Sequence, residues 1–235
     1  MVNFYTLIPA VNEESSIGKV LVDIPDIVSE KIVINNGSID KTAKVARENG
    51  ATVINETERG YGAACLKGLN YVFLKANDDD VIVFLDGDYS DFPEEMIQII
   101  KPIIEDGADM VIGSRITGAK LGKAEAGALL PQALFGNWLS TKLIKLIWNY
   151  NFTDLGPFRA IKVSALKQMK MADRNYGWTV EMQVKAAKLK MKCTEIPVSY
   201  RKRIGKSKVS GTLTGSFKAG VKILWIIFIY TFKKI

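Results

Sequence analysis

The sequence predicts an α/β fold with an open, mostly parallel sheet flanked by helices. Short apolar runs and helical segments alternate through residues 1–115, as they do in successive βαβ units. The run at 81–85 is apolar throughout and rich in β-branched and aromatic residues, as expected for a strand covered on both faces. With 235 residues, of which 48% are hydrophobic, the chain is long enough for one large domain with a substantial core.

Strands and helices are expected to alternate regularly in this first half. The strands are 4–8, 31–35, 51–55, 81–85 and 110–112, and the helices are 16–28, 41–49 and 94–106, with another that opens from a Gly-rich loop at 59–62 and runs to 74. Pro9 is expected to end the first strand. Asp40 is placed to begin the second helix and Gly50 to close it.

The amino-acid composition and the pattern of expected elements change after residue 115. Residues 116–128 are small, polar and rich in Gly and Ala, which predicts a mobile loop over the functional site. Helices are expected at 135–148 and 178–191, and an extended segment at 193–200. Between these helices, the segment 153–161 is expected to form a turn. It contains Asp154 and Arg159, a polar pair that is expected to be buried.

The charge of the chain indicates an anionic binding partner. Lys and Arg number 32 against 25 Asp and Glu, and this net charge of +7 favours a nucleotide, a phosphorylated substrate, an anionic membrane or nucleic acid. The chain has no His, which excludes His-based catalytic triads. Its two cysteines lie far apart without metal-ligand spacing, which indicates reduced cytosolic thiols.

Both ends of the chain bear on membrane contact. The N-terminus lacks the basic flank and apolar core of a signal peptide. The apolar run at 223–232 is shorter than the roughly 20 residues that a membrane span needs. Its aromatic residues suit insertion at a membrane interface, with the flanking Lys222, Lys233 and Lys234 toward head groups. A buried C-terminal helix or an oligomer contact is the alternative.

Two carboxylates directly follow the apolar run at 81–85. Asp86, Gly87 and Asp88 would lie beyond the carboxyl end of a strand, where ligands bind in open α/β sheets. The intervening glycine lets both carboxylates approach one Mg²⁺ or Mn²⁺ ion that bridges phosphates. A simple Asp/Gly turn is the alternative. Asp91 is expected to be a helix N-cap or an outer-shell residue because a helix begins after it.

Dinucleotide-binding and P-loop folds do not fit this pattern. The segment after the first expected strand reads PAVNEE, whereas a Rossmann fingerprint places its glycines there. Gly60 and Gly62 follow a later strand and lack a third partner, and no Walker-type loop is present.

The motifs taken together resemble the family 2 glycosyltransferases of the GT-A fold. Eight of them occur in the expected order over nearly the whole chain: IPAVNEE, NNGSIDKT, RGYGAA, FLDGDYSD, GSR, TDLGPFRA, GWTVEM and RIGKSKVSGT. The distal motifs are most similar to dolichol-phosphate and polyprenyl-phosphate glycosyltransferases. The resemblance implies a metal-dependent enzyme that transfers a hexose with inversion from a nucleotide sugar of the UDP-glucose or GDP-mannose type.

The resemblance also implies which residues bind the donor. Asp86 and Asp88 would hold Mg²⁺ or Mn²⁺ against the diphosphate. The residues expected to surround the nucleotide sugar are Pro9, Ala10, Asn12, Glu13, Asn36, Gly37, Ser38, Arg59, Gly60, Gly62, Gly87, Arg115, Arg203 and Lys208. Asn36 would help to read the base, but the family's usual aspartate is replaced by the Asn35, Asn36 pair. An amide both donates and accepts, so uracil and guanine both remain possible. A turn with an N-cap is the alternative for Asn36, Gly37 and Ser38.

Two kinds of acceptor remain open. A hydroxyl needs a general base, which would be Asp154 or Glu181. A lipid monophosphate, with a second pKa of about 6, is already nucleophilic at neutral pH and needs only cations. The basic run at 201–208 supplies these, and the resemblance places it, with Arg203 as a catalytic residue, at the acceptor phosphate and donor diphosphate. Structural alternatives are a cap or a pair with Arg159 for Asp154, a helix-dipole contact for Glu181, and a solvated basic face for the run.

The resulting expectation is a GT-A domain at 1–210, with a nucleotide-sugar-binding half at 1–115 and an acceptor half at 116–210, followed by a membrane-associating helix at 211–235. The enzyme would glycosylate a polyprenyl phosphate, either in the cytoplasm or peripherally on the cytoplasmic face of a membrane. Transfer to a hydroxyl of a glycan or glycolipid is the second reading. A noncatalytic anion- or nucleic-acid-binding protein is the third, and it is disfavoured because the basic residues lack interleaved aromatics.

Overall fold

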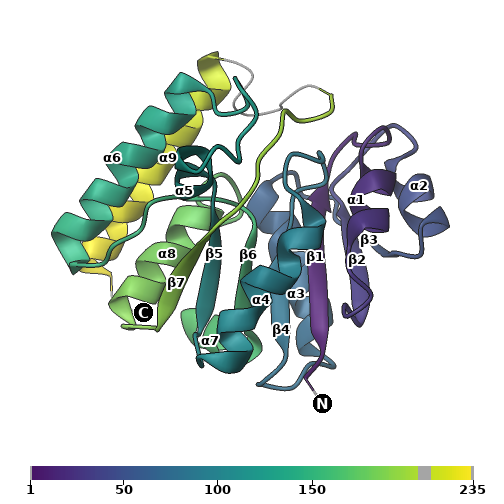
Figure 1. Cartoon of the computed structure of the whole chain (residues 1–235), viewed down its shortest axis with the longest axis horizontal. Coiled ribbons are helices and arrows are strands. Elements are labelled where there is room, and N and C mark those ends of the chain that lie inside the picture. The colour runs from purple at the N-terminus through teal and green to yellow at the C-terminus, as the bar shows by residue number, and fades with distance from the viewer. Residues whose placement is uncertain (1, 206–212, 234–235) are drawn as a thin grey trace.

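The protein is a three-layer α/β structure with helices on both faces of one central sheet (Figure 1). The computed structural model describes residues 2–205 and 213–233, with the backbone alone at 213–217. Over these residues the sheet has seven strands in the order β3-β2-β1-β4-β6-β5-β7. The strands are β1 (Phe4–Ala10), β2 (Glu30–Asn35), β3 (Thr52–Asn55), β4 (Val81–Phe84), β5 (Met110–Ser114), β6 (Arg159–Lys162) and β7 (Cys193–Pro197).

The helices fill the connections between these strands. They are α1 (Ile17–Asp23), α2 (Thr42–Glu48), α3 (Tyr61–Phe73), the 3₁₀ turn η1 (Pro93–Glu95), α4 (Met96–Glu105), α5 (Arg115–Lys120), α6 (Pro131–Trp148), α7 (Val163–Met169), α8 (Trp178–Lys188) and α9 (Leu213–Phe232). The predicted alternation of strand and helix is therefore confirmed through residue 114, and the fold is the mostly parallel open sheet that the sequence predicts.

The first four strands form a parallel block with β1 between β2 and β4. The prediction that Pro9 ends β1 is wrong, because the strand runs to Ala10, whose carbonyl accepts from Asn36. Leu7 accepts from Leu85 on the β4 side, and Pro9 faces the same side two residues later. Strand β4 ends at Phe84, the residue that pairs with Leu7, so Pro9 lies beyond the last paired residue on this side. The missing N–H of Pro9 therefore removes no hydrogen bond between β1 and β4.

Strand β6 makes the other half of the sheet mixed. It runs antiparallel to both neighbours, β4 and β5, whereas β7 is parallel to β5. The sequence predicts a turn at 153–161 but neither this strand nor α7 after it. Four residues that begin with a buried arginine, Arg159, give no periodic pattern that would identify a strand.

Several helix boundaries also differ from expectation. Helix α1 stops at Asp23 instead of 28 because Ile24 precedes Pro25 and is extended, with ψ of 124°. Residues 115–120 form α5 rather than loop, since the Ser114 side chain accepts from the N–H of Thr117 at 3.1 Å and caps the helix. Helix α6 begins at Pro131, a residue suited to the first turn.

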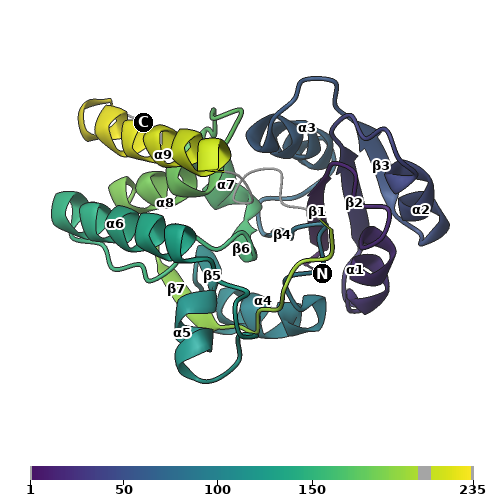
Figure 2. The ribbon, with the colours of Figure 1, turned by 90° about the horizontal axis from the view of Figure 1, so that it is seen from above.

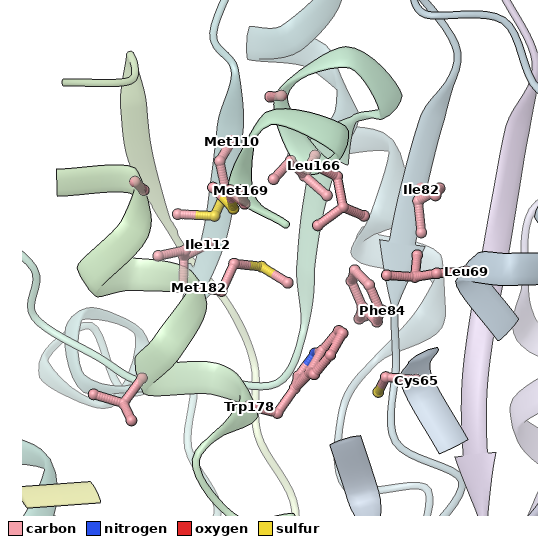
Figure 3. Close-up of a cluster of buried hydrophobic side chains, with 14 of the residues drawn as sticks. Cys65, Leu69, Ile82, Phe84, Met110, Ile112, Leu166, Met169, Trp178 and Met182 are labelled. Carbon is pink, nitrogen blue, oxygen red and sulfur yellow. The ribbon is translucent and has the colours of Figure 1, made fainter. Parts of the chain in front are cut away.

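Helices lie on each face of the sheet (Figure 2), and a cluster of buried apolar side chains lies between them and each face. On one face, Phe84 of β4 packs edge-on against Trp178 of α8, with ring centroids 6.0 Å apart, and Figure 3 shows Leu69 and Met182 beside them. On the other face, α1 and α4 cover β1, β4 and β5. Coverage on both sides explains why β4 is apolar at every position. Both cysteines are free thiols, as predicted, and Cys65 is buried.

Helix α9 packs beside α6 and α8 at one edge of the molecule (Figures 1 and 2). Ile226, Ile227 and Tyr230 face inward and are buried, whereas Trp225 and Phe228 are more than half exposed. The helix thus has an apolar face against the protein and an aromatic face toward the surroundings. Among the described residues no helix has the length and hydropathy needed to cross a membrane.

Candidate active site

A pocket of about 660 Å³ opens where β1, β2 and β4 end. Its polar end includes Glu13, Asn36 and the Asp86–Asp88 turn, which follow these strands within a few residues. Its other end is apolar and is formed by segments far apart in the sequence: Leu129, Leu130 and Ala133 at the start of α6, and Ala219 and Ile223 of α9. The pocket therefore joins the carboxyl edge of the sheet to a gap between two surface helices.

Asp86 lies at the floor of the polar end. The hydroxyl of Tyr61 donates to its Oδ1 at 3.1 Å. Burial, followed by the charge of Asp88, raises the pKa of Asp86 to about 7. Two carboxylates in one partly dry turn repel each other, so a cation placed between them stabilises both.

Asp88 is held by its own turn. Its Oδ1 accepts from the N–H of Ser90 at 3.0 Å and from the Ser90 hydroxyl at 2.6 Å. Its Oδ2 lies 3.1 Å from Nη1 of Arg203. Tyr89, between Asp88 and Ser90, has a φ of 62°, an uncommon conformation for an aromatic residue, which tightens the turn.

The segment 200–204 crosses over this turn and delivers Arg203. Backbone bonds join the N–H of Ile204 to the carbonyl of Asp88 and that of Arg201 to the carbonyl of Ser90. The Arg201 guanidinium stacks on the ring of Tyr89, 3.4 Å from its centroid. Arg203 then bridges two loops, with Nη2 at 2.8 Å from Oε1 of Glu13. The alternative of a solvated basic face is therefore wrong for Arg201 and Arg203. Lys206 and Lys208 lie outside the described residues.

The residues of this turn fit a divalent cation. A positive charge, the Arg203 guanidinium, already lies beside Oδ2 of Asp88, and burial, followed by the charge of Asp88, raises the pKa of Asp86. Within the described part of the chain no cluster of three or more His, Cys, Asp or Glu side chains is placed to hold a metal. A cation bound by Asp86 and Asp88 would take its other ligands from water and from a bound diphosphate.

Asp91 is a third carboxylate near the site. It is 2% exposed, and neither of its carboxylate oxygens has a hydrogen-bond partner among the residues that the structure describes. Burial and the charge of Asp86 raise its pKa well above the usual value, which favours the neutral form of this carboxyl. The N-cap expectation is wrong, because the residue before η1 is Phe92 and Asp91 accepts no helix N–H.

The expected nucleoside residues divide into pocket lining and loop supports. Pro9, Ala10, Glu13, Arg59 and Gly60 line the pocket, together with Asn36, Gly87, Arg115 and Arg203. The Asn36 amide tethers the glycine loop, since Nδ2 donates to the carbonyl of Glu58 at 2.6 Å and Oδ1 accepts from Gly60 at 2.9 Å. Asn12, Gly37, Ser38 and Gly62 are not among the lining residues. Asn12 and Ser38 instead join two loops, through the Asn12 N–H and the Ser38 Oγ at 3.0 Å.

Gly60 and Gly62 are required for protein packing. A Cβ at Gly60 would lie 2.1 Å from the carbonyl oxygen of Arg174, and one at Gly62 would lie 2.0 Å from that of Asp173. The N–H groups of Gly62 and Ala63 donate to carbonyls of the same segment. The expected backbone approach to the nucleotide is therefore corrected for Gly62, because protein carbonyls occupy the first turn of α3.

Asp154 pairs with Arg115 and not, as considered, with Arg159. Arg115 makes a two-pronged contact, Nε to Oδ2 at 2.8 Å and Nη2 to Oδ1 at 2.9 Å, and its N–H donates to Oδ2 as well. Arg159 instead donates to the carbonyls of Gly156 and Thr179. Asp154 is fully buried and outside the pocket lining, so its carboxylate orients Arg115, which does line the pocket.

Glu181 also lies away from the pocket lining. It is 1% exposed and forms an ion pair with Lys185 at 2.8 Å. Its carboxylate accepts from the N–H of Asp173 at 2.8 Å and from the Tyr230 hydroxyl at 2.6 Å. Glu181 therefore joins α8 to α9, and no bond leads from it to the pocket among the contacts that the structure describes.

Sequence reasoning missed several aromatic residues of the site. Tyr61, Tyr176, Trp178 and Tyr200 line the pocket, and Tyr61 bonds directly to Asp86. The position of Tyr61 between two glycines at the start of a helix is a local signal that could have identified it. Tyr200 carries no such signal, since its contacts at the site are with residues far away in the sequence, among them Arg115, which lies 5.1 Å from the centroid of its ring.

The fold and the Asp-Gly-Asp turn at its strand ends define a glycosyltransferase of the GT-A type. The sequence pattern described as "Glycosyl transferase family 2" matches residues 5–169, and the chain belongs to this family. The predicted family and enzyme class are thereby confirmed. The match ends in α7, so α8, β7, the segment 200–204 and α9 lie beyond it.

Relatives align over most of the chain. An uncharacterized glycosyltransferase of Mycobacterium tuberculosis is 33% identical over 91% of this chain and 92% of its own. A dolichyl-phosphate hexose transferase of Haloferax volcanii is 32% identical, covering 84% of this chain and 82% of its own. An undecaprenyl-phosphate mannosyltransferase of Micrococcus luteus is 28% identical, covering 89% and 88%.

Among solved structures, the chain resembles glucosyl-3-phosphoglycerate synthase from Mycobacterium tuberculosis in complex with Mn²⁺, uridine diphosphate and phosphoglyceric acid. The TM-score is 0.77 at 18% identity, covering all of this chain and 80% of the other. At that identity the likeness establishes the fold.

Proposed function

We propose that this enzyme transfers a hexose, with inversion, from a nucleotide sugar to a polyprenyl phosphate at a membrane surface. One observation carries the proposal: a single pocket joins a charged end, at the Asp-Gly-Asp turn, to an apolar end between α6 and α9. A substrate with a phosphate head and a long hydrocarbon tail matches both ends. The names of the Haloferax and Micrococcus relatives support this acceptor class.

The donor belongs at the charged end. Asp86 and Asp88 would hold Mg²⁺ or Mn²⁺, which when bound stabilises the negative charge of the departing nucleoside diphosphate. Arg203 and Arg59 face the same space and would pair with the diphosphate, while Pro9, Ala10 and Asn36 border the nucleoside. UDP-glucose and GDP-mannose both remain candidate donors.

The acceptor needs no general base in this reading. A phosphate oxygen attacks the anomeric carbon, and the bond from that carbon to the donor diphosphate breaks, with its electron pair leaving on the diphosphate. Arg115 and Lys202, which also line the pocket, would bind the acceptor phosphate. Both carboxylates considered as bases are engaged elsewhere, Asp154 with Arg115 and Glu181 with Lys185.

Exposed aromatic side chains near the apolar end of the pocket support contact with a lipid surface. Phe135 and Trp138 of α6 and Trp225 and Phe228 of α9 are all more than half exposed. Aromatic residues of this kind insert at a membrane interface, and a net charge of +7 favours anionic lipid. Peripheral contact of α6 and α9 with the cytoplasmic face of a membrane would let a lipid tail enter the pocket between them.

The test is transfer of radiolabel from a panel of UDP- and GDP-sugars into organic-extractable lipid, with added polyprenyl phosphate, with and without Mn²⁺. We expect one donor to give a metal-dependent, mild-acid-labile lipid product that Asp88→Asn abolishes. Metal-dependent binding of a nucleotide sugar without lipid product would overturn the acceptor assignment and redirect the search to glycan hydroxyls.

A further inference from the structure

The segment 172–177, which precedes α8, forms one wall behind the donor end of the pocket. The carbonyl of Arg174 accepts from the N–H of Ala63 at 2.9 Å, and that of Asn175 accepts from Gly62 at 3.3 Å. Arg174 also forms an ion pair with Glu58, on the other side of the glycine loop. Glu58 and Gly60 are the residues whose backbones hold the Asn36 amide, so the position of this segment sets the position of the loop.

Helix α9 holds the same segment from the opposite side. The Nζ of Lys222 lies 2.8 Å from Oδ2 of Asp173, a carboxylate that is 6% exposed. The other oxygen of Asp173 accepts from the N–H groups of Asn175 at 2.8 Å and Gly177 at 3.0 Å. Asp173 is thus the organising residue of the turn, and Lys222 is its cationic partner. The expectation that Lys222 faces lipid head groups is therefore wrong.

Two further contacts from α9 end on this turn. Ile226 packs so closely on Gly177 that a Cβ there would lie 2.8 Å from its Cγ1. Tyr230 donates to Glu181, whose second oxygen accepts from the N–H of Asp173 at 2.8 Å. Charge, packing and hydrogen bonding therefore each connect the C-terminal helix to the wall of the donor site.

We propose that Lys222 is a positioning residue for donor binding. Through Asp173 it fixes the segment 172–177, which in turn fixes the glycine loop, so that nucleotide affinity depends on a docked C-terminal helix. This rests on the proposed function, in which the charged end of the pocket binds a nucleoside diphosphate. By thermodynamic linkage, a surface that stabilises docked α9 strengthens nucleotide binding by the same factor as the nucleotide strengthens docking.

The experiment measures the Kd of UDP and of GDP, each with Mn²⁺, by isothermal titration of the full chain. Lys222→Met keeps the apolar stem and removes the charge, and we expect it to weaken binding by about 5- to 50-fold, within the usual range of site-to-site coupling. Lys222→Arg should restore most of the affinity. Lys218→Met, at an exposed position of the same helix, is the matched control and should bind as the wild type does.

Each outcome decides between the inference and the function on which it rests. A wild-type Kd for Lys222→Met overturns the inference alone, whereas a wild-type protein that binds neither nucleotide overturns the proposed donor and the inference with it. Should Lys222→Met fold poorly, Asp173→Asn removes the same ion pair from the other side. If the two residues act as one unit, the double variant binds no more weakly than the weaker single variant.

Discussion

The guanidinium of Arg203 lies 3.1 Å from the carboxylate of Asp88, the residue expected to bind the metal. A divalent cation and this arginine therefore compete for one oxygen. Arg203→Gln should raise the affinity for Mn²⁺ in the absence of nucleotide by several-fold, because two charges about 4 Å apart near a protein surface interact by up to about 4 kcal/mol before desolvation is counted. Electron paramagnetic resonance of free Mn²⁺ measures this affinity. Unchanged or weaker Mn²⁺ binding would contradict the competition.

Asp91 should make the protein less stable as the pH rises. In the unfolded chain an aspartate ionises near pH 4, whereas burial keeps the folded Asp91 protonated to a much higher pH. The unfolded state thus releases a proton that the folded state keeps, and stability falls between the two pKa values. Asp91→Asn removes this loss. We expect its melting temperature to exceed that of the wild type by about 2–4 °C at pH 8, with a smaller difference at pH 5. A difference independent of pH would show that ionisation is not the cause.

Asp154→Asn should damage stability more than chemistry. Removing one partner of a buried ion pair typically costs about 3–5 kcal/mol, here because the Arg115 guanidinium loses its two-pronged carboxylate. Urea unfolding measures the loss, and Glu181→Gln, which also breaks a buried pair, should behave similarly. Assayed below its melting temperature, neither variant should show the loss of about 10²-fold or more expected when a general base is removed. A loss of that size with intact folding would favour the hydroxyl acceptor.

Two glycine-to-alanine substitutions should have opposite effects on the stability of the protein. Gly62→Ala would place a Cβ 2.0 Å from the carbonyl oxygen of Asp173, so it should lower the melting temperature and weaken nucleotide binding. Gly136→Ala, in helix α6 with no described atom within 4 Å of the new Cβ, should stabilise the protein by about 0.5–1 kcal/mol. Thermal unfolding of both variants checks the pair. Equal tolerance at both positions would contradict the contact between the glycine loop and the segment 172–177.

The exposed aromatic residues of α9 should contribute to membrane binding but not to the stability of the folded protein. Trp225→Ser with Phe228→Ser removes two rings that are each more than half exposed, and each is worth about 1.5–3 kcal/mol when buried in an apolar phase. Partition into anionic phospholipid vesicles should therefore fall by about tenfold or more, with little change in melting temperature. Leu74→Ser, which removes an exposed apolar residue at the end of α3, is the control. Equal vesicle binding by all three proteins would contradict interfacial insertion.

The sequence was most informative where a contact is local. Strand β4 and the two carboxylates after it could be predicted because five apolar residues and an Asp-Gly-Asp turn lie within eight positions of each other. The ion-pair partner of Asp154 could not be predicted, because Arg115 is 39 residues away and other cationic side chains lie nearer to Asp154 in the sequence. The same holds for Lys222 and Asp173, which meet only once α9 has packed against α8. Strand β6 was missed because its four residues show no alternation, and its place in the sheet depends on two strands made earlier.

The position of β6 has a consequence for how the chain folds. Strands β4 and β5 are not neighbours, since β6 lies between them and pairs with both. Until residues 159–162 have left the ribosome, β4 has an open edge and β5 has no strand to join it to the first block. A nascent or truncated chain that ends before β6 exposes unpaired strand edges, which promote aggregation. Closure of the sheet therefore waits for a late, antiparallel strand, and we expect the refolding of this protein to be slow for its size.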